Sequence, residues 1–112
     1  GCISPGMKTR FRALHDYTAK LPLCAATESE ELAGLTTRQA IELGVMNGIA
    51  FEIEGYAARM RSQIDDLCVI FTGGDANFFV KRIKNTIFAN CNLVFCGLNR
   101  ILEYNASEEH LN

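Results

Sequence analysis

The chain has 112 residues and a formal net charge of -2, with 48% hydrophobic and 21% charged residues; this balance is typical of one compact globular domain and excludes a disordered chain. No apolar run approaches the roughly 20 residues that cross a bilayer, and the near-neutral charge does not favour a nucleic-acid surface. We therefore expect neither a membrane nor a nucleic acid as a partner.

The first predicted element is an amphipathic helix of about four turns. Ser4 and Pro5 have the order of an N-cap followed by proline at the first helical position, and Pro22 marks the end of the pattern. Steps of four and three place one set of residues on a single face: Met7, Phe11, Leu14, Thr18 and Leu21. Residues 23–35 show no sustained period and are predicted to form a solvated connection.

A second helix is predicted to begin at a capping box. The Thr36 hydroxyl can accept a hydrogen bond from the backbone N–H of Gln39, while the Gln39 side chain reaches back to the N–H of Thr36. The apolar positions then advance by four or three residues over about seven turns. These positions are Ile41, Val45, Ile49, Ile53, Tyr56, Met60 and Ile64.

Gly44, Gly48 and Gly55 share one side of this second helix. Each glycine costs roughly 1 kcal/mol of helix propensity relative to alanine, so close approach of another backbone is expected to offset the loss. That backbone belongs either to a helix of the same chain or to a symmetry mate in a homodimer. The sequence leaves both alternatives open.

A strand, a glycine turn and a short helix are predicted next. Residues 67–71 are apolar and rich in β-branched and aromatic types, as in a strand buried on both faces. The Thr72-Gly73-Gly74 turn and the helix start behind it could receive an anion, but such a turn also serves simply to reverse the chain. Asp75 equally suits the N-cap of the helix.

The remaining elements are predicted as a brief extended piece within residues 86–92 and a final helix over residues 93–104. The chain is thus expected to be mostly helical with one or two strands. A strand cannot satisfy its backbone groups alone, so the strands that complete the sheet must come from elsewhere.

By itself the chain shows no catalytic constellation. His15 and Asp16 are adjacent, and adjacent residues of a helix do not face each other. No phosphate loop, serine elbow or metal-ligand spacing is present. The odd number of cysteines, four of them in or beside apolar runs, predicts small buried hydrophobes in a reducing cytosol. The cysteines are Cys2, Cys24, Cys68, Cys91 and Cys96.

Six segments in one order carry a resemblance to a known family. The segments are Gly1-Cys2-Ile3-Ser4-Pro5-Gly6, Ala13-Leu14-His15, Leu21-Pro22-Leu23, Thr37-Arg38-Gln39-Ala40-Ile41 with Gly44 and Gly48, Phe71-Thr72-Gly73-Gly74-Asp75-Ala76, and Leu93-Val94-Phe95-Cys96-Gly97-Leu98. Together they resemble the C-terminal half of type III pantothenate kinase, also called the Bvg accessory factor family.

The resemblance implies an α/β fold, the C-terminal part of a ribonuclease H-like domain of the acetate kinase, sugar kinase, Hsp70 and actin superfamily. It also implies that residues 1–112 are a fragment of a two-domain, cytoplasmic, homodimeric kinase whose N-terminal half is absent. The strands missing from the predicted sheet are then missing with the rest of the protein.

The implied activity is ATP-dependent phosphorylation of pantothenate, the first step of coenzyme A biosynthesis. ATP would act with a divalent cation, and a monovalent cation, potassium or ammonium, would be bound mainly by residues absent from this chain. The family's catalytic residues match no position here, so the fragment alone is expected to be inactive. The fragment would supply part of the wall of the substrate site and part of the dimer interface.

Two sets of site residues follow from the resemblance. Thr37 matches a substrate-contacting threonine that in related dimers reaches pantothenate across the subunit interface, although Thr36 replaces the asparagine of that motif. Thr72, Gly73 and Gly74 match a glycine turn near the nucleotide. The alternative function is a non-catalytic regulatory or transcriptional accessory protein of the same family.

Overall fold

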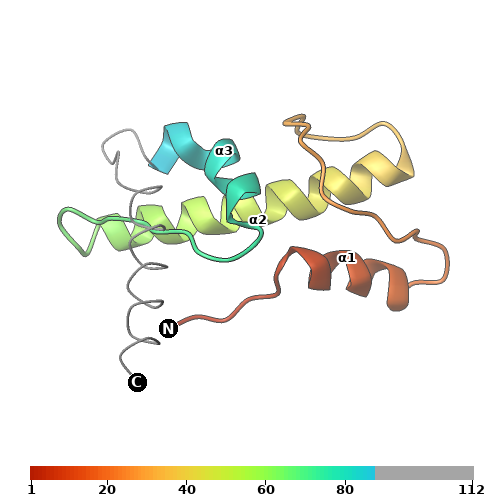
Figure 1. The fold of residues 1–112 in the computed structure, drawn as a ribbon, viewed down its shortest axis with the longest axis horizontal. Coiled ribbons are helices and arrows are strands. Elements are labelled where there is room, and N and C mark those ends of the chain that lie inside the picture. Colours follow the sequence, from red (N-terminus) through yellow and green to blue (C-terminus); the bar gives the residue numbers. More distant parts are fainter. Residues whose placement is uncertain (88–112) are drawn as a thin grey trace, which may run out of the picture. The chain divides into compact units, whose positions relative to one another are not determined.

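Three helices form the regular secondary structure of residues 1–87, the part of the chain that the computed structural model describes (Figure 1). The helices are α1 (Met7–Asp16), α2 (Thr37–Arg61) and α3 (Ala76–Ile87). The expectation of a mostly helical chain is confirmed for these residues. None of the helices within this range is long and apolar enough to cross a membrane.

The chain divides into two compact units, Gly1–Ile53 and Glu54–Asn112, and α2 runs through the boundary between them. The first unit holds α1, the connection after it and most of α2. The second holds the end of α2, the glycine turn and α3.

Helix α1 is shorter at both ends than predicted. The Ser4 hydroxyl does not cap it, because that hydroxyl accepts a hydrogen bond from Arg10 Nη2 at 3.0 Å. Gly6 takes the N-cap position, with an extended ψ of 179° and no side-chain cap. At the other end the helix stops at Asp16, where the N–H of Tyr17 donates to the carbonyl of Ala13 at 3.0 Å.

The predicted inner face of α1 is confirmed for its first two turns. Met7 and Phe11 are buried, with only 2% of Phe11 exposed. Leu14 and Leu21 are half-buried, whereas Thr18 is exposed. The Thr18 hydroxyl donates to the Leu14 carbonyl, a local bond that ties this residue to the end of α1.

The capping box at the start of α2 is confirmed. The N–H of Gln39 donates to Thr36 Oγ1 at 3.2 Å, and the N–H of Thr36 donates to Gln39 Oε1 at 3.4 Å. The same Gln39 oxygen accepts from the N–H of Leu35 at 3.0 Å. The signal could be found in the sequence because all its atoms lie within five consecutive residues.

The apolar stripe of α2 is buried in its first half only. Ile41, Val45 and Ile49 are buried as predicted. Tyr56, Met60 and Ile64 keep 46%, 42% and 51% of their surface exposed, so the prediction of an inward stripe along the whole helix is wrong. Four positions of α2 outside the predicted stripe are also buried: Leu43, Met46, Ala50 and Ala57.

The connection of residues 23–35 contains no helix, and it is bonded to α2 within the first unit. Asn47 Nδ2 donates to the carbonyl of Glu31 at 2.9 Å and to that of Leu32 at 3.3 Å. Gly34 lies against the first turn of α2: a Cβ at this position would stand 2.5 Å from the backbone carbon of Gln39. Only glycine fits such a backbone approach.

The prediction of a strand at residues 67–71 is wrong, because the structure shows no strand anywhere in residues 1–87. Leu67, Val69 and Phe71 are half-buried and alternate with exposed Cys68 and Ile70. This is the period of extended chain with one inner face, and a β-strand additionally requires a hydrogen-bonded neighbour.

Most of the predictions for the chain after residue 85 fall on residues that the structure does not describe. Residues 86 and 87 belong to α3, so the extended piece predicted at 86–92 is wrong at its start. The remainder of that piece, the helix predicted at 93–104, Cys91 and Cys96 lie outside the described residues.

Candidate functional site

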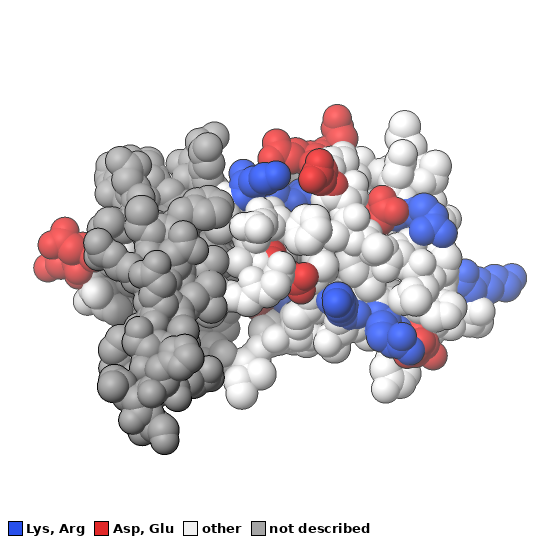
Figure 2. Space-filling model, in the orientation of Figure 1, with Lys and Arg blue, Asp and Glu red and all other residues white. Residues whose placement is uncertain are grey.

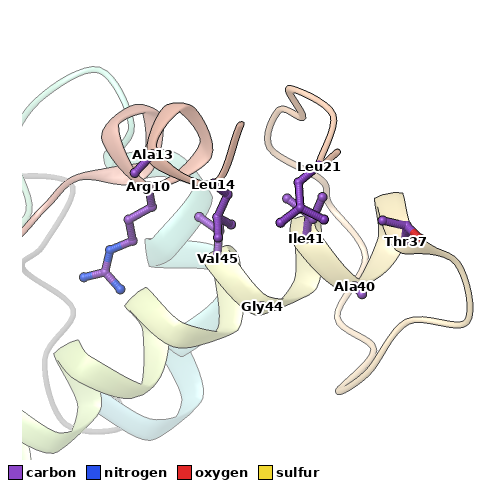
Figure 3. Close-up of a pocket in the computed structure, with 9 residues that line it drawn as sticks. All are labelled: Arg10, Ala13, Leu14, Leu21, Thr37, Ala40, Ile41, Gly44 and Val45. Carbon is purple, nitrogen blue, oxygen red and sulfur yellow. The ribbon is translucent and has the colours of Figure 1, made fainter. Parts of the chain in front are cut away.

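A groove of about 710 Å³ lies between α1 and the first turns of α2, within the first unit (Figure 3). Its walls are apolar, with one hydroxyl-bearing residue at one end and one guanidinium-bearing residue at the other. The lining residues are Arg10, Ala13, Leu14, Leu21, Thr37, Ala40, Ile41, Gly44 and Val45. Such a groove suits a ligand with an apolar body and few polar groups.

Thr37, the predicted substrate-binding residue, is the first residue of α2 and lies at one end of this groove (Figure 3). Its side chain is exposed. The hydroxyl used by the capping box belongs to Thr36 and not to Thr37.

The backbone of Leu21, which lines the groove, is bonded to His15 near the end of α1. His15 Nδ1 lies 2.7 Å from the carbonyl oxygen of Leu21. A carbonyl oxygen only accepts, so Nδ1 carries the hydrogen and donates. Sequence reasoning had assigned no such role to His15, since the pattern of α1 gives no sign of a bond to a residue beyond the helix.

The far end of the groove is formed by Arg10, whose guanidinium group has three acceptors. Nε donates to the carbonyl of Pro5 at 2.9 Å, and Nη2 donates to Ser4 Oγ at 3.0 Å and to Glu52 Oε2 at 2.5 Å. Arg10 and Glu52 are both half-buried. A hydrogen bond with Ser4, together with the Arg10 guanidinium, lowers the pKa of Glu52 below its ordinary value of 4.5.

This lowered pKa predicts an acid-dependent loss of stability. Because the folded chain favours the ionised carboxylate, the contribution of Glu52 is present above the ordinary glutamate pKa of 4.5 and disappears as the pH falls through the lower folded pKa. We expect Glu52→Gln to melt below the wild type at neutral pH, and the difference to disappear once the pH has fallen below the lowered pKa of Glu52. Melting curves across this range test it, and a gap independent of pH would contradict it.

Gly48 lies next to the Arg10 side chain. The Arg10 Nη1 atom lies 3.8 Å from the point that a Cβ on Gly48 would occupy, whereas no heavy atom lies within 4 Å of the corresponding points on Gly44 and Gly55. Within residues 1–87 no backbone of another element is therefore in contact with these Cβ positions, which speaks against the intrachain alternative for this range. The homodimer alternative stays a prediction.

The predicted nucleotide-side residues lie in the second unit, in the turn before α3. Thr72, Gly73 and Gly74 are all exposed. Gly73 has a φ of 102°, a conformation that L side chains rarely adopt, and its carbonyl accepts from the N–H of Ala76 at 3.3 Å. Among residues 1–87, no heavy atom beyond the chain neighbours lies within 4 Å of a Cβ position on either glycine, so no described residue covers the turn there.

Asp75 immediately precedes the first residue of α3, as an N-cap would. Its carbonyl accepts from the N–H of Phe78 at 3.2 Å. The helix start that sequence reasoning weighed against a ligand site at this turn is thus present. The two interpretations are compatible, because Asp75 stands directly before the helix while Gly73 and Gly74 are exposed.

Metal-binding and charge signals are weak across residues 1–87. No group of three or more His, Cys, Asp and Glu side chains in this range could hold a metal ion. Positive and negative side chains are interspersed on the face shown in Figure 2.

Another pocket, of about 560 Å³, is formed by residues 27–35 of the connection and the first turns of α2.

The cysteine predictions are confirmed in part. Cys24 is buried, with its Sγ 3.7 Å from the Pro22 carbonyl and 3.7 Å from Arg38 Nη1. Cys68 is exposed, which contradicts its predicted burial. Burial on both faces is expected only of a strand inside a sheet, whereas Cys68 lies on the exposed side of residues 67–71.

The residues that form the groove lie in a part of the chain that matches a known protein family. Residues 1–59 match the family model described as type III pantothenate kinase. This range contains α1, every residue that lines the groove, and Glu52.

Individual relatives match over nearly the whole chain. A type III pantothenate kinase of Flavobacterium psychrophilum is 50% identical over 104 residues, which cover 93% of this chain and 43% of that protein. Proteins of the same name from Flavobacterium johnsoniae and Cytophaga hutchinsonii are 45% and 47% identical over 93% and 94% of the chain. The chain spans 43% and 45% of their lengths, so it covers less than half of these relatives.

Proposed function

Because the chain belongs to the type III pantothenate kinase family, we propose that it is the C-terminal part of a longer protein that transfers a phosphoryl group from ATP to pantothenate. The match across residues 1–59 carries this proposal, and the relatives named as pantothenate kinases support it. The resemblance drawn from the six sequence segments is confirmed.

Within this function Thr37 is the substrate contact. Its exposed position at the end of an apolar groove supports a hydrogen bond between its hydroxyl and a polar group of pantothenate. The apolar lining would take up the carbon skeleton of the substrate. This arrangement holds the substrate in one orientation, which is the main contribution a protein makes to phosphoryl transfer.

The turn of Thr72, Gly73 and Gly74 lies on the nucleotide side. The backbone of both glycines is open to close approach, and the first turn of α3 adds backbone N–H groups that favour an anion. These residues fit a phosphate group of ATP, which with its divalent cation supplies the group that is transferred. The chain's own part is to position that phosphate.

The wider assembly follows from the same family. We propose a ribonuclease H-like domain completed by the rest of the protein, a homodimer in which Thr37 serves the substrate of the partner subunit, and a cytoplasmic location. A monovalent cation, potassium or ammonium, would be bound mainly by residues beyond this chain. The accessory-protein alternative has no support from the relatives above, which are named as kinases.

The test is pantothenate-dependent release of ADP by the full-length protein, measured beside the 112-residue chain. We expect turnover by the full-length protein and none by the chain alone, because phosphoryl transfer needs charge-stabilising groups on opposed surfaces. A full-length protein that binds ATP without pantothenate-dependent turnover would contradict the kinase assignment. Turnover by the chain alone would contradict the division of roles.

A further inference from the structure

Arg10 is the one charged residue among those that line the groove. Its three acceptors come from two distant parts of the chain: Ser4 and Pro5 lie six and five residues before it, and Glu52 lies 42 residues after it. One guanidinium group thus joins the N-terminal residues 1–6, α1 and α2.

Residues 1–6 have no regular structure and are exposed. One backbone bond fastens their end to α1, from the N–H of Arg10 to the carbonyl of Gly6 at 3.1 Å. The Arg10 side chain adds the bonds to Pro5 and Ser4, so it determines the path of this arm. The planar fork of a guanidinium group can hold several acceptors in fixed directions, which a lysine ammonium cannot.

The other side of the clamp is Glu52 on α2. Its carboxylate is ionised in the presence of Arg10 and lies 2.5 Å from Nη2. Gly48, one turn earlier on α2, lies beside the guanidinium group: a Cβ there would be 3.8 Å from Arg10 Nη1, an ordinary van der Waals contact. By contrast, Arg12 is exposed and pairs with Asp16 on its own helix at 3.5 Å.

We propose that Arg10 is a positioning residue of the groove: through Glu52 it clamps the 1–6 arm and α1 onto α2, and so fixes the wall that faces a ligand held at Thr37. The effect on pantothenate rests on the proposed function, whereas the clamp itself rests on the contacts of Arg10 alone. Arg10 acts through the arrangement of α1 and α2 and needs no contact with the substrate.

The clamp is tested by nuclear magnetic resonance on the isotopically labelled 112-residue chain. In the wild type we expect slow exchange of the Arg10 Nε hydrogen with water and a backbone order parameter at Ser4 near the rigid value of about 0.85. In Arg10→Gln the order parameter should fall below about 0.6. Arg12→Gln is the matched control and should leave it unchanged. Arg10→Lys keeps the positive charge and is the second variant, in case Arg10→Gln does not fold. It should lower the order parameter of Ser4 as well.

The consequence for function is tested in the full-length kinase. Arg10→Gln and Arg10→Lys should raise the KM for pantothenate by roughly threefold to tenfold while the KM for ATP stays unchanged, a split that a smaller folded fraction cannot produce. Arg12→Gln should leave both constants unchanged.

The outcomes separate the two proposals. An arm that stays ordered in the Arg10 variants would overturn the clamp. A loosened arm with an unchanged KM for pantothenate in an active enzyme would overturn the positioning role. A wild-type protein without pantothenate-dependent turnover would refute the proposed function, and the Ser4 order parameter would still decide whether the clamp exists.

Discussion

Gly34→Ala is expected to lower the free energy of unfolding by about 1 to 3 kcal/mol. The new Cβ would stand 2.5 Å from the backbone carbon of Gln39 and 2.6 Å from the backbone nitrogen of Ala40. These are backbone atoms in the first turn of α2, which the capping box holds in place. The methyl group can be accommodated only if the connection moves away from α2, which strains its bonds to Asn47.

Urea unfolding of the chain measures this loss, and Gly44→Ala is the matched control. Gly44 lies within α2 with no heavy atom within 4 Å of its Cβ position, so alanine there should stabilise the chain by about 0.4 to 1 kcal/mol through helix propensity. Opposite signs for the two substitutions are the expected result. A Gly34 variant as stable as the wild type would show that residues 34 and 39 are not packed together.

Thr37→Ala in the full-length kinase is expected to raise the KM for pantothenate on the order of 10- to 100-fold. If the hydroxyl is the partner of a buried polar group of the substrate, its removal leaves that group unsatisfied, at a cost of about 1 to 3 kcal/mol. Thr37→Ser keeps the hydroxyl and should retain most of the affinity. The measurement is the steady-state KM for each substrate.

Thr36→Ala provides the structural control. It removes the oxygen that accepts from Gln39, and loss of such a cap costs about 0.5 to 2 kcal/mol of stability. We expect this variant to melt earlier with an unchanged KM for pantothenate, and Thr37→Ala to show the reverse. If both variants lost stability and neither changed the KM, Thr37 would be only part of the helix start.

The comparison between sequence and structure is clearest at the helix ends. The start of α2 could be predicted because the capping box is complete within a few residues. The start of α1 could not, although Ser4 and Pro5 have the order of a cap. Their polar atoms bind Arg10 instead, and sequence order alone does not decide which of two donors a hydroxyl meets.

The same limit applies to the groove. Thr37 was found by resemblance, and the apolar residues Leu14, Leu21, Ile41 and Val45 were predicted to face inward. Arg10 and Glu52 were missed because 42 residues separate them, and no short pattern joins residues so far apart. Gly48 was singled out for a backbone contact, but among residues 1–87 its neighbour is the Arg10 side chain, at ordinary contact distance.

Local order and family membership are therefore what the sequence by itself determined: the α2 cap, the inner face of α1, the turn at Gly73 and the motifs of the kinase family. Each depends on neighbouring residues or on a preserved order of segments. Only the tertiary structure decided that Arg10 closes the groove, that Gly34 meets α2 and that residues 67–71 have one inner face. Burial and long-range hydrogen bonds depend on which surfaces meet in space, and that is a property of the folded chain.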